Sequence, residues 1–323
     1  MIQILVGIAF VVSLTGTLQS AELSLPLHPD EAAIIRGIVD VEKLEVESAE
    51  MPGWAKGGVL KVLGERGIAT DQLKSGSVAV KGSPQLALSF IFNPEGRVVA
   101  LHGNGPWLRN DSLRRLQGMP ELRSIRIDHN GFAGNDPRIP EFDGSGFEAL
   151  ADSKLADIKI GLSFSDQGME QCAKIKTLQA FSVAHSRVTE ASIAFFAGHT
   201  CLTAFSIGEM ASNRVSEKAL AAIAKIPNLT HVGFKECYVT YNGGFVHLAP
   251  LKGKLVEIDL TMSVADEADL NKLKADHPGA KIITIPPAEI VKRHKFIAAN
   301  LAKQAPPSLA APLKAALEAA SVK

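Results

Sequence analysis

The sequence predicts an α/β solenoid in which each repeat contributes one strand and one helix, and three observations support this. The first is an aliphatic triplet with the spacing 1-4-6, which recurs along the middle of the 323-residue chain. The second is the distance between successive triplets, which lies between 23 and 33 residues. The third is a helix-start pattern that follows most triplets. A period of this length is typical of stacked strand–helix units.

The triplets place apolar residues at positions 1, 4 and 6 of each repeat. The clear copies are Leu122-Ile125-Ile127, Leu155-Ile158-Ile160, Leu178-Phe181-Val183, Leu202-Phe205-Ile207, Leu229-Val232-Phe234 and Leu255-Ile258-Leu260. A weaker copy, Ala280-Ile283-Ile285, closes the series, and Val98 and Leu101 open it with Gly103 at position 6. Because side chains alternate along a strand, positions 4 and 6 should be buried and positions 3 and 5 exposed.

The helix-start pattern is a pair of small or acidic residues followed by an apolar face. It occurs at 143–147 (DGSGF), 165–169 (SDQGM), 189–193 (TEASI) and 216–220 (SEKAL), and more loosely at 242–245 (NGGF). Ser, Thr and Asp cap helix N-termini, and an acid in the first turn offsets the helix dipole. Asp166, Glu190 and Glu217 line up in successive repeats, and we expect them to play this dipole role rather than to form a catalytic carboxylate pair.

Together these patterns resemble the leucine-rich-repeat superfamily, specifically its ribonuclease-inhibitor-like, cysteine-containing branch. The resemblance covers residues 97 to 285. It implies a parallel concave sheet, α-helices on the convex side, and protein partners that bind the concave face. It also places a buried Asn or Cys at position 9, where the side chain satisfies turn backbone; Asn130 and Cys237 occupy that position.

The predicted organisation has four parts: a signal peptide (1–21), an N-terminal cap region (22–85), the solenoid of about seven or eight repeats (86–285) and a helical basic tail (286–323). Residues 86–92 and 98–101 flank NPEG and predict a β-hairpin that covers the edge of the first repeat. In the tail, six basic residues face two acidic ones. We expect one amphipathic helix over 288–303, then a break at 305–307 and Pro312 before a last short helix.

Two global features limit the function. The apolar run at 4–14 fits the core of a secretory signal, so we expect export to the cell surface, the periplasm or the medium; an uncleaved membrane anchor is the alternative. Basic and acidic residues balance at 34 each, which argues against a nucleic-acid partner. The three cysteines, Cys172, Cys201 and Cys237, occupy different positions in their repeats, so no disulfide framework is expected.

The exposed strand positions predict a polarised concave groove. Position 5 reads Arg126, Lys159, Ser182, Ser206, Gly233, Asp259 and Thr284; position 3 reads Ser124, Asp157, Ala180, Ala204, His231, Glu257 and Ile282. The face runs from basic through small to acidic, although freely varying exposed residues would also explain it. The 33-residue interval after Leu122 predicts a projecting loop at 131–142. The candidate binding residues are Arg126, Asp128, His129, Lys159, Ser182, Ser206, His231, Lys235, Glu257 and Asp259.

Catalytic and metal-binding motifs are weak. The G-x-G-x-x-A at 144–149 lacks the preceding strand that a dinucleotide site needs, and the helix-start pattern explains it. An EF-hand template starting at Asp128 fails at its Gly and Glu positions, which leaves only an irregular calcium site in the long loop. A zinc site at His231 would need ligands from elsewhere. We therefore expect no cofactor and no catalytic or metal residues, and a non-catalytic module that binds a protein or peptide outside the cytoplasm. The alternatives are a structural envelope component anchored by its N-terminus or basic tail and, more weakly, an enzyme with its activity in the N-terminal cap.

Overall fold

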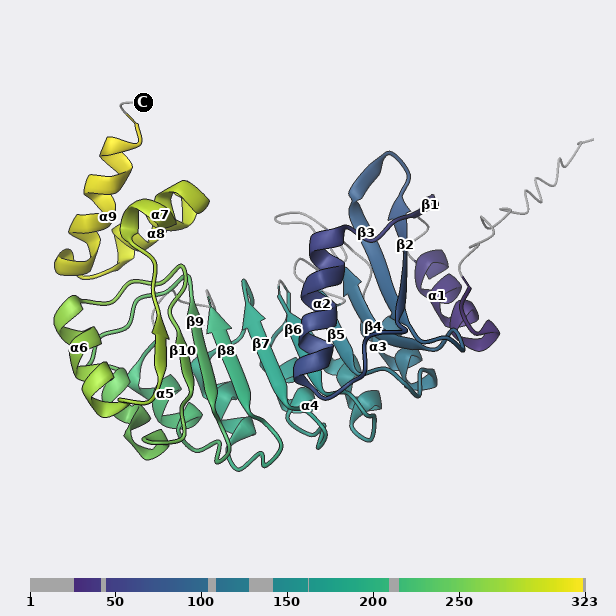
Figure 1. Cartoon of the computed structure of the whole chain (residues 1–323), viewed down its shortest axis with the longest axis horizontal. Helices are drawn as coiled ribbons and strands as arrows, with labels where there is room; N and C mark the ends of the chain where they lie inside the picture. The colour runs from purple at the N-terminus through teal and green to yellow at the C-terminus, as the bar shows by residue number, and fades with distance from the viewer. Residues whose placement is uncertain are drawn as a thin grey trace, which may run out of the picture.

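The eleven strands form a single sheet whose spatial order follows the sequence, β1 to β11 (Figure 1). The computed structural model describes residues 26–41, 45–103, 109–127, 142–161, 163–208 and 215–321. The strands are β1 (Val46–Ala49), β2 (Lys74–Val80), β3 (Ser83–Phe92), β4 (Val98–Gly103), β5 (Ser124–Ile127), β6 (Asp157–Ile160), β7 (Ala180–Ala184), β8 (Ala204–Gly208), β9 (His231–Lys235), β10 (Glu257–Asp259) and β11 (Lys281–Ile283). β1 to β4 pair antiparallel, and β4 to β11 pair parallel. This topology confirms the predicted leucine-rich-repeat solenoid.

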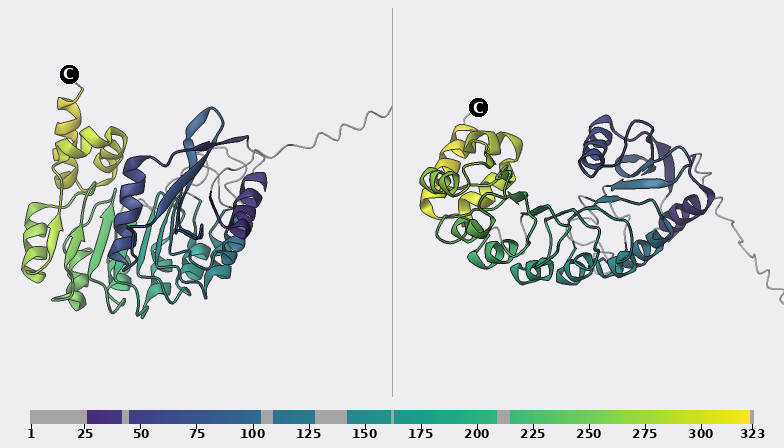
Figure 2. Two further views of the ribbon diagram at one scale, coloured as in Figure 1. Left: turned by 45° about the vertical axis from the view of Figure 1, so that its right-hand side comes forward. Right: turned by 60° about the horizontal axis from the view of Figure 1, so that its bottom comes forward.

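Helices cover one face of the sheet, and the sheet curves around the opposite face (Figure 2). These convex elements are α3 (Asn110–Arg115) with η1 (Leu116–Gly118), η3 (Ser145–Leu150), α4 (Asp166–Cys172), η4 (Glu190–Phe196), α5 (Glu217–Ile223), η5 (Phe245–Leu251) and α6 (Glu267–Asp276). As predicted, positions 4 and 6 are buried; Ile125, Ile158 and Phe234 each have 0 % exposure. Neighbouring repeats stack their core rings, with the centroids of Phe181 and Phe205 5.7 Å apart.

Besides the short η1, the convex elements η3, η4 and η5 are 3-10 helices, where α-helices were expected. α4, α5 and α6 each begin at a side chain that accepts a hydrogen bond from a backbone N–H of the first turn: Ser165, Ser216 and Asp266. η3, η4 and η5 begin at Gly144, Thr189 and Gly244, which form no such bond. Capping satisfies the free N–H groups of an α-helix start. Within these six repeats, α-helix therefore forms where the N-cap side chain is available.

The N-terminal region extends the sheet and also reaches onto its concave face. The strands on either side of Asn93 to Gly96 are β3 and β4, and β3 covers the outer edge of β4. α1 (Pro29–Val41) packs on the convex core. α2 (Gly53–Glu65) instead packs Ala55, Val59 and Leu63 in a small separate core with Ala100. Ala100 is in register with Ser124 at position 3, so α2 lies on the concave side of β3 and β4, as Figure 2 shows in its right-hand view.

A buried carboxylate holds α1 against the hairpin. Glu31 has 0 % exposure, and its Oε2 accepts a hydrogen bond from the backbone N–H of Val98 at 2.5 Å. Its Oε1 lies 3.2 Å from Nη1 of Arg97. Since a buried charge is costly unless it is paired, these two contacts fix α1 to the start of the first repeat.

The C-terminal tail folds into three helices, α7 (Pro287–Arg293), α8 (Lys295–Gln304) and α9 (Pro307–Ala319), rather than the expected long helix and short one. The backbone of His294 (φ −155°, ψ 82°) separates α7 from α8. Pro312 lies inside α9 instead of before it, because Leu309 and Leu313 are buried on either side of it and hold the helix in place. The three helices share a core with Val264 and pack on the turns that follow β9, β10 and β11.

The register of the last repeat differs from the prediction by one residue. Glu257 is opposite Lys281, and Asp259 is opposite Ile283, so Lys281 and Ile283 occupy positions 3 and 5, where Ile282 and Thr284 were expected. Ile282 instead packs against the solenoid core. Ile285, assigned to core position 6, packs against the C-terminal helices. Its apolar character reflects that second core, and a one-residue slip exchanges the two faces of a strand.

Candidate functional site

The concave face brings the predicted position-5 residues into one row. The register aligns Arg126, Lys159, Ser182, Ser206, Gly233 and Asp259 on successive strands β5 to β10. His102 of β4 precedes them in the same row. We call this series, from His102 to Asp259, the concave row. Asp128 and His129, and residues 131–141 of the expected loop, lie outside the described residues, as does the expected signal segment. Phe142, at the end of that loop, is buried with 2 % exposure.

Position 3 is buried in the first repeats, where exposure was expected. Ser124, Asp157 and Ala180 have exposures of 0 %, 4 % and 7 %. Only from Ala204 onward does this position open, and His231 is exposed. Gly233 of the concave row is also buried. The exposed strip of the concave face is therefore narrower in the first repeats than the alternation rule predicts.

Arg126 is part of a buried network at the basic end of the concave row. Its Nη1 donates to both carboxylate oxygens of Asp157, at 3.0 Å and 2.9 Å. Asp157 also accepts a hydrogen bond from Ser124 Oγ at 2.7 Å. The carboxylate is thus satisfied within the fold, as a buried charge requires. The positive charge of Arg126 is therefore neutralised by the carboxylate of Asp157 within the fold.

The acidic end is compensated in a similar way. Glu257 lies 3.7 Å from Nζ of Lys281 on β11, and Asp259 accepts a hydrogen bond from the backbone N–H of Thr261 at 2.8 Å. Nδ1 of His231 is 2.8 Å from Thr230 Oγ1. Lys235 ends β9, one position beyond the core residue Phe234. Local pairing at both ends makes the charge gradient along the row weaker than the sequence suggests.

The centre of the concave row is built from small side chains. Ser182, Ser206 and Gly233 are adjacent in register, with Ala180 and Ala204 beside them at position 3. A Cβ added to Gly233 would lie 2.6 Å from Ser206 Oγ, so no larger residue fits there without movement. These residues form a low floor that a partner can approach closely.

Trp54 stands at the start of this row, and sequence reasoning did not single it out. It lies in the first turn of α2, and its ring packs edge-on against the ring of His102, with centroids 6.0 Å apart. It is 76 % exposed, the highest value among the exposed large hydrophobic side chains of the described chain. Nothing in the local sequence shows that α2 folds back onto the concave face. The contact joins residues 48 positions apart.

A second unforeseen feature follows the strands at the rim where they end. His185 and Glu236, each at position 8, have Nε2 and Oε2 3.2 Å apart, although they belong to repeats two apart. Both have positive φ, 50° and 57°, as does Met262 at the same position (65°). A non-glycine residue in this region is uncommon. The sharp turn after each strand is what imposes it.

Cys237 lies in the turn core, as position 9 predicts. Its exposure is 1 %, and burial raises the pKa of its thiol to about 12. Ser263, at position 9 of the next repeat, donates from Oγ to the carbonyl of Phe234 at 2.7 Å and lies 3.5 Å from Cys237 Sγ. A protonated, buried thiol is neither a nucleophile nor a metal ligand at neutral pH.

The helix-start acids link neighbouring repeats. Asp166 accepts hydrogen bonds from the N–H and Oγ1 of Thr189, both at 2.7 Å. Glu190 accepts from the N–H of Ser216 at 2.9 Å and from its hydroxyl. Both acids stand in the first helical turn as predicted, and their main partners are the next repeat's N-caps. These contacts give them a structural role on the convex side.

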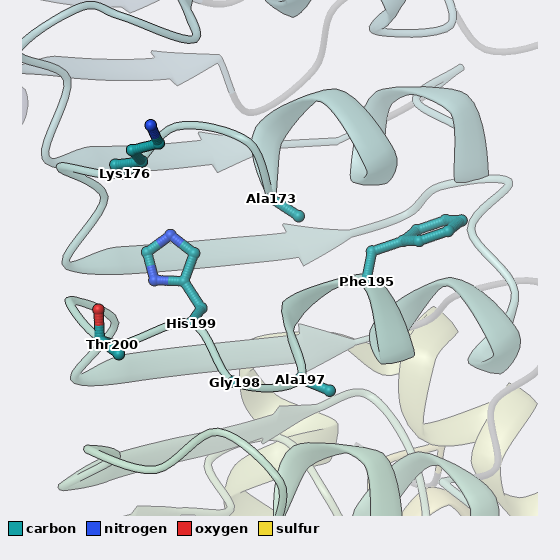
Figure 3. A pocket seen from close by; sticks show the side chains of 7 residues that line it. All are labelled: Ala173, Lys176, Phe195, Ala197, Gly198, His199 and Thr200. Atoms are coloured by element: carbon teal, nitrogen blue, oxygen red, sulfur yellow. The ribbon is translucent and has the colours of Figure 1, made fainter.

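A shallow pocket of about 280 Å³ opens between the convex elements α4 and η4 (Figure 3). Its lining includes Lys176, Phe195 and His199. Nε2 of His199 is held 3.0 Å from the carbonyl of Ile175, and Figure 3 shows Phe195 on the far side of the opening from Lys176. The imidazole of His199 is thus already engaged by a backbone carbonyl. No predicted site residue lies here.

Among the described residues, no group of three or more His, Cys, Asp and Glu side chains is arranged to hold a metal ion. None of the helices in the described part of the chain combines the length and apolar character needed to cross a bilayer. The 144–149 segment begins η3, and Asn110 accepts from the backbone of Gly144 and donates to Asp143. The cofactor-like spacing is thus part of a helix start.

No protein-family model matches the sequence, and no curated protein matches it either. Among solved structures, the chain is similar to internalin C2 from Listeria monocytogenes, with 12 % sequence identity and a TM-score of 0.36. The match covers 58 % of this chain and 70 % of that one. A superposition this loose carries no inference about function, so the fold assignment stands on the strand topology itself.

Proposed function

We propose that this chain is a non-catalytic binding module of the leucine-rich-repeat type, which takes a protein or peptide on its concave face. The observation that carries the proposal is Trp54, a largely exposed tryptophan held by α2 against His102 at the head of the concave row. Tryptophan is the residue type most enriched among the side chains that dominate binding energy at interfaces.

The low floor further along the concave row supports an elongated partner. The small residues Ser182, Ser206 and Gly233 form a strip on successive strands. The strip belongs to a sheet whose inner strands are hydrogen-bonded on both sides, so a partner meets side chains and does not add a strand. An aromatic anchor at the head of the row and a low strip three strands further along suit a peptide segment or a projecting loop that lies across the strands.

The charges at the two ends orient the partner rather than supply most of its affinity. Arg126 is paired with Asp157, and Glu257 is paired with Lys281. Exposed or compensated pairs of this kind influence association rate and specificity more than affinity. Trp54, Ser182 and Ser206 should therefore contribute more to binding than Arg126, whose charge is already paired with Asp157.

The sequence features support a narrower family branch, a site of action outside the cytoplasm and a second contact region. Helices on the convex side and the buried Cys237 at position 9 support membership of the ribonuclease-inhibitor-like, cysteine-containing branch. The apolar run at residues 4–14 supports action outside the cytoplasm, and the 131–142 loop stays a proposed second contact. The alternative, a structural envelope component, is supported by the basic tail, in which six basic residues face two acidic ones.

The test is a pair of concave variants measured against a partner identified by crosslinking. Trp54→Ala should weaken binding about thirtyfold, as loss of an interfacial hot spot of about 2 kcal/mol does. Ser206→Trp should block the floor and weaken binding by a similar factor. Phe195→Ala, which removes an exposed aromatic from the convex side, is the matched control and should leave affinity unchanged. Equal affinity for all four proteins would contradict the proposal.

A further inference from the structure

An exposed basic and aromatic segment marks the junction of α7 and α8. Residues 292–296 read Lys-Arg-His-Lys-Phe, and all five are exposed. Lys292 is 80 % exposed and Phe296 is 70 % exposed. The residues on either side, Val291 and Ile297, are each buried with 5 % exposure in the core of the three C-terminal helices. We call these five residues the basic corner. The side chains of the basic corner are therefore exposed to solvent, while the residues that flank them anchor the segment in the core.

The charge of the basic corner is only partly compensated. Glu289 accepts a hydrogen bond from Nε of Arg293 at 2.9 Å and lies 3.8 Å from Nζ of Lys292. Nζ of Lys295 is 3.4 Å from the hydroxyl of Ser321, a neutral partner. Three cations therefore face one carboxylate. This local excess stands on a chain whose charges balance overall.

We propose that the basic corner binds an anionic lipid surface, with Phe296 entering the interfacial region and Lys292, Arg293 and Lys295 meeting the headgroups. An exposed aromatic side chain beside cations is the arrangement by which helices lie in a membrane interface. Each basic residue close to an anionic surface contributes about a fivefold gain in partitioning. Phe296 adds an apolar contribution that pairing of charges alone would not give.

The shape of the corner favours a lipid surface over a protein or nucleic-acid partner. Phe296 projects from the first turn of α8, and its exposed fraction is 70 %. A protein partner would need a matching cavity for the ring, whereas a fluid interface adapts to a projecting side chain. Duplex binding rests on several phosphate contacts, and the three cations here are few for it. The site is independent of the concave row, so both can be occupied together.

The experiment uses the full chain and a reporter at the corner itself. Phe296→Trp places a fluorophore at the proposed insertion point, and the signal of the unsubstituted protein, which holds Trp54 and Trp107, is subtracted. Adding vesicles of phosphatidylcholine mixed with phosphatidylserine should shift the emission to the blue, and brominated lipid should quench it. Phosphatidylcholine alone should do neither. Because the reporter is local, binding through the apolar run at residues 4–14 does not produce this signal.

Charge variants in the reporter background then test the electrostatic part. Lys292→Glu with Lys295→Glu should weaken the anionic-vesicle response at least about 25-fold, from two factors of about five. Lys218→Glu with Lys225→Glu makes the same change of net charge on the convex side and should have no effect. In the unsubstituted background, Phe296→Ser should reduce vesicle co-sedimentation several-fold, and Phe195→Ser should not.

Three results would overturn the proposal: an unshifted reporter, equal responses to neutral and anionic vesicles, or equal losses in the corner and convex variants. A reporter shift of the same size with polyglutamate or with single-stranded DNA would also overturn it, because the corner would then recognise polyanions in general. None of these outcomes affects the concave-row proposal, which is tested with Trp54 and Ser206.

Discussion

Nη1 of Arg126 on β5 contacts both carboxylate oxygens of Asp157 on β6, at 3.0 Å and 2.9 Å. Asp157 is almost fully buried, and Ser124 donates a third hydrogen bond to it. The sequence places both residues on an exposed, polarised face. In the structure they instead form a contact that joins two repeats. A substitution of Arg126 would therefore change the stability of the fold, and its effect on binding could not be interpreted until that stability had been measured.

Arg126→Ala should lower the free energy of unfolding by about 3 kcal/mol, because it leaves the Asp157 carboxylate buried without its cation. The double variant Arg126→Ala with Asp157→Ala should lose less than the sum of the two single variants. Urea unfolding of the four proteins measures the coupling. Additive losses would show that the contact contributes nothing.

Ser216 has two roles, since it caps α5 and donates its hydroxyl to Glu190 of the preceding repeat. Ser216→Ala should cost about 2 kcal/mol, about half from the cap and half from the charge-assisted hydrogen bond. Glu190→Gln keeps an acceptor oxygen and should cost less. Thermal unfolding compares the two; a larger loss for Glu190→Gln would contradict this ranking.

His277 makes stability depend on pH. It is buried with 2 % exposure, and neither ring nitrogen has a hydrogen-bond partner. Burial, the largest cause, lowers its pKa from the ordinary value of 6.5. The folded state then binds fewer protons than the unfolded state, so the contribution of His277 is complete above about pH 6.5 and is lost as the pH falls below it.

In His277→Leu this part of the acid sensitivity should disappear. The unsubstituted protein should lose up to about 1.4 kcal/mol per pH unit more than the variant on acidification below about pH 6.5. Urea unfolding across this range gives both slopes. Identical slopes would mean that the ring is solvated or paired in the folded protein.

The three cysteines should differ sharply in reactivity. Cys172 and Cys237 are buried and Cys201 is exposed, and burial raises the pKa of the first two thiols. Ellman's reagent should therefore modify one thiol in the native protein and three after denaturation. Cys201→Ser should abolish the native reaction. Rapid modification of a second thiol in the native protein would contradict the buried position of Cys237.

The fold could be predicted because it depends on local alternation. From β4 to β10, the strands that carry the triplet bury residues such as Ile158 and Phe205 on one side. The period of two predicts this without knowledge of the rest of the chain. The predicted register of the last repeat was wrong because of a long-range contact: Ile285 is apolar because the C-terminal helices cover it. η3 and η5 begin at glycines, which have no side chain to act as a cap, and Thr189 at the start of η4 forms no capping bond.

The candidate site was harder to predict because its chemistry depends on contacts between distant residues. The concave row was foreseen, since stacking repeats aligns Ser182 with Ser206. The pairing of Arg126 with Asp157 crosses the 33-residue interval, and the contact of Trp54 with His102 depends on how α2 folds back. The buried residues of α2 show an ordinary amphipathic helix, and nothing in them indicates which face of the sheet it covers.

Site-specific photocrosslinking tests the central claim most directly. A benzophenone amino acid is introduced at Ser206 on the concave floor and, as the matched control, at Ala194, which is exposed on the convex element η4. The account predicts a discrete crosslinked partner from Ser206 that is absent from Ala194 and is lost when Trp54→Ala is added. A partner captured at Ala194 and not at Ser206, or capture at Ser206 that persists without Trp54, would contradict it.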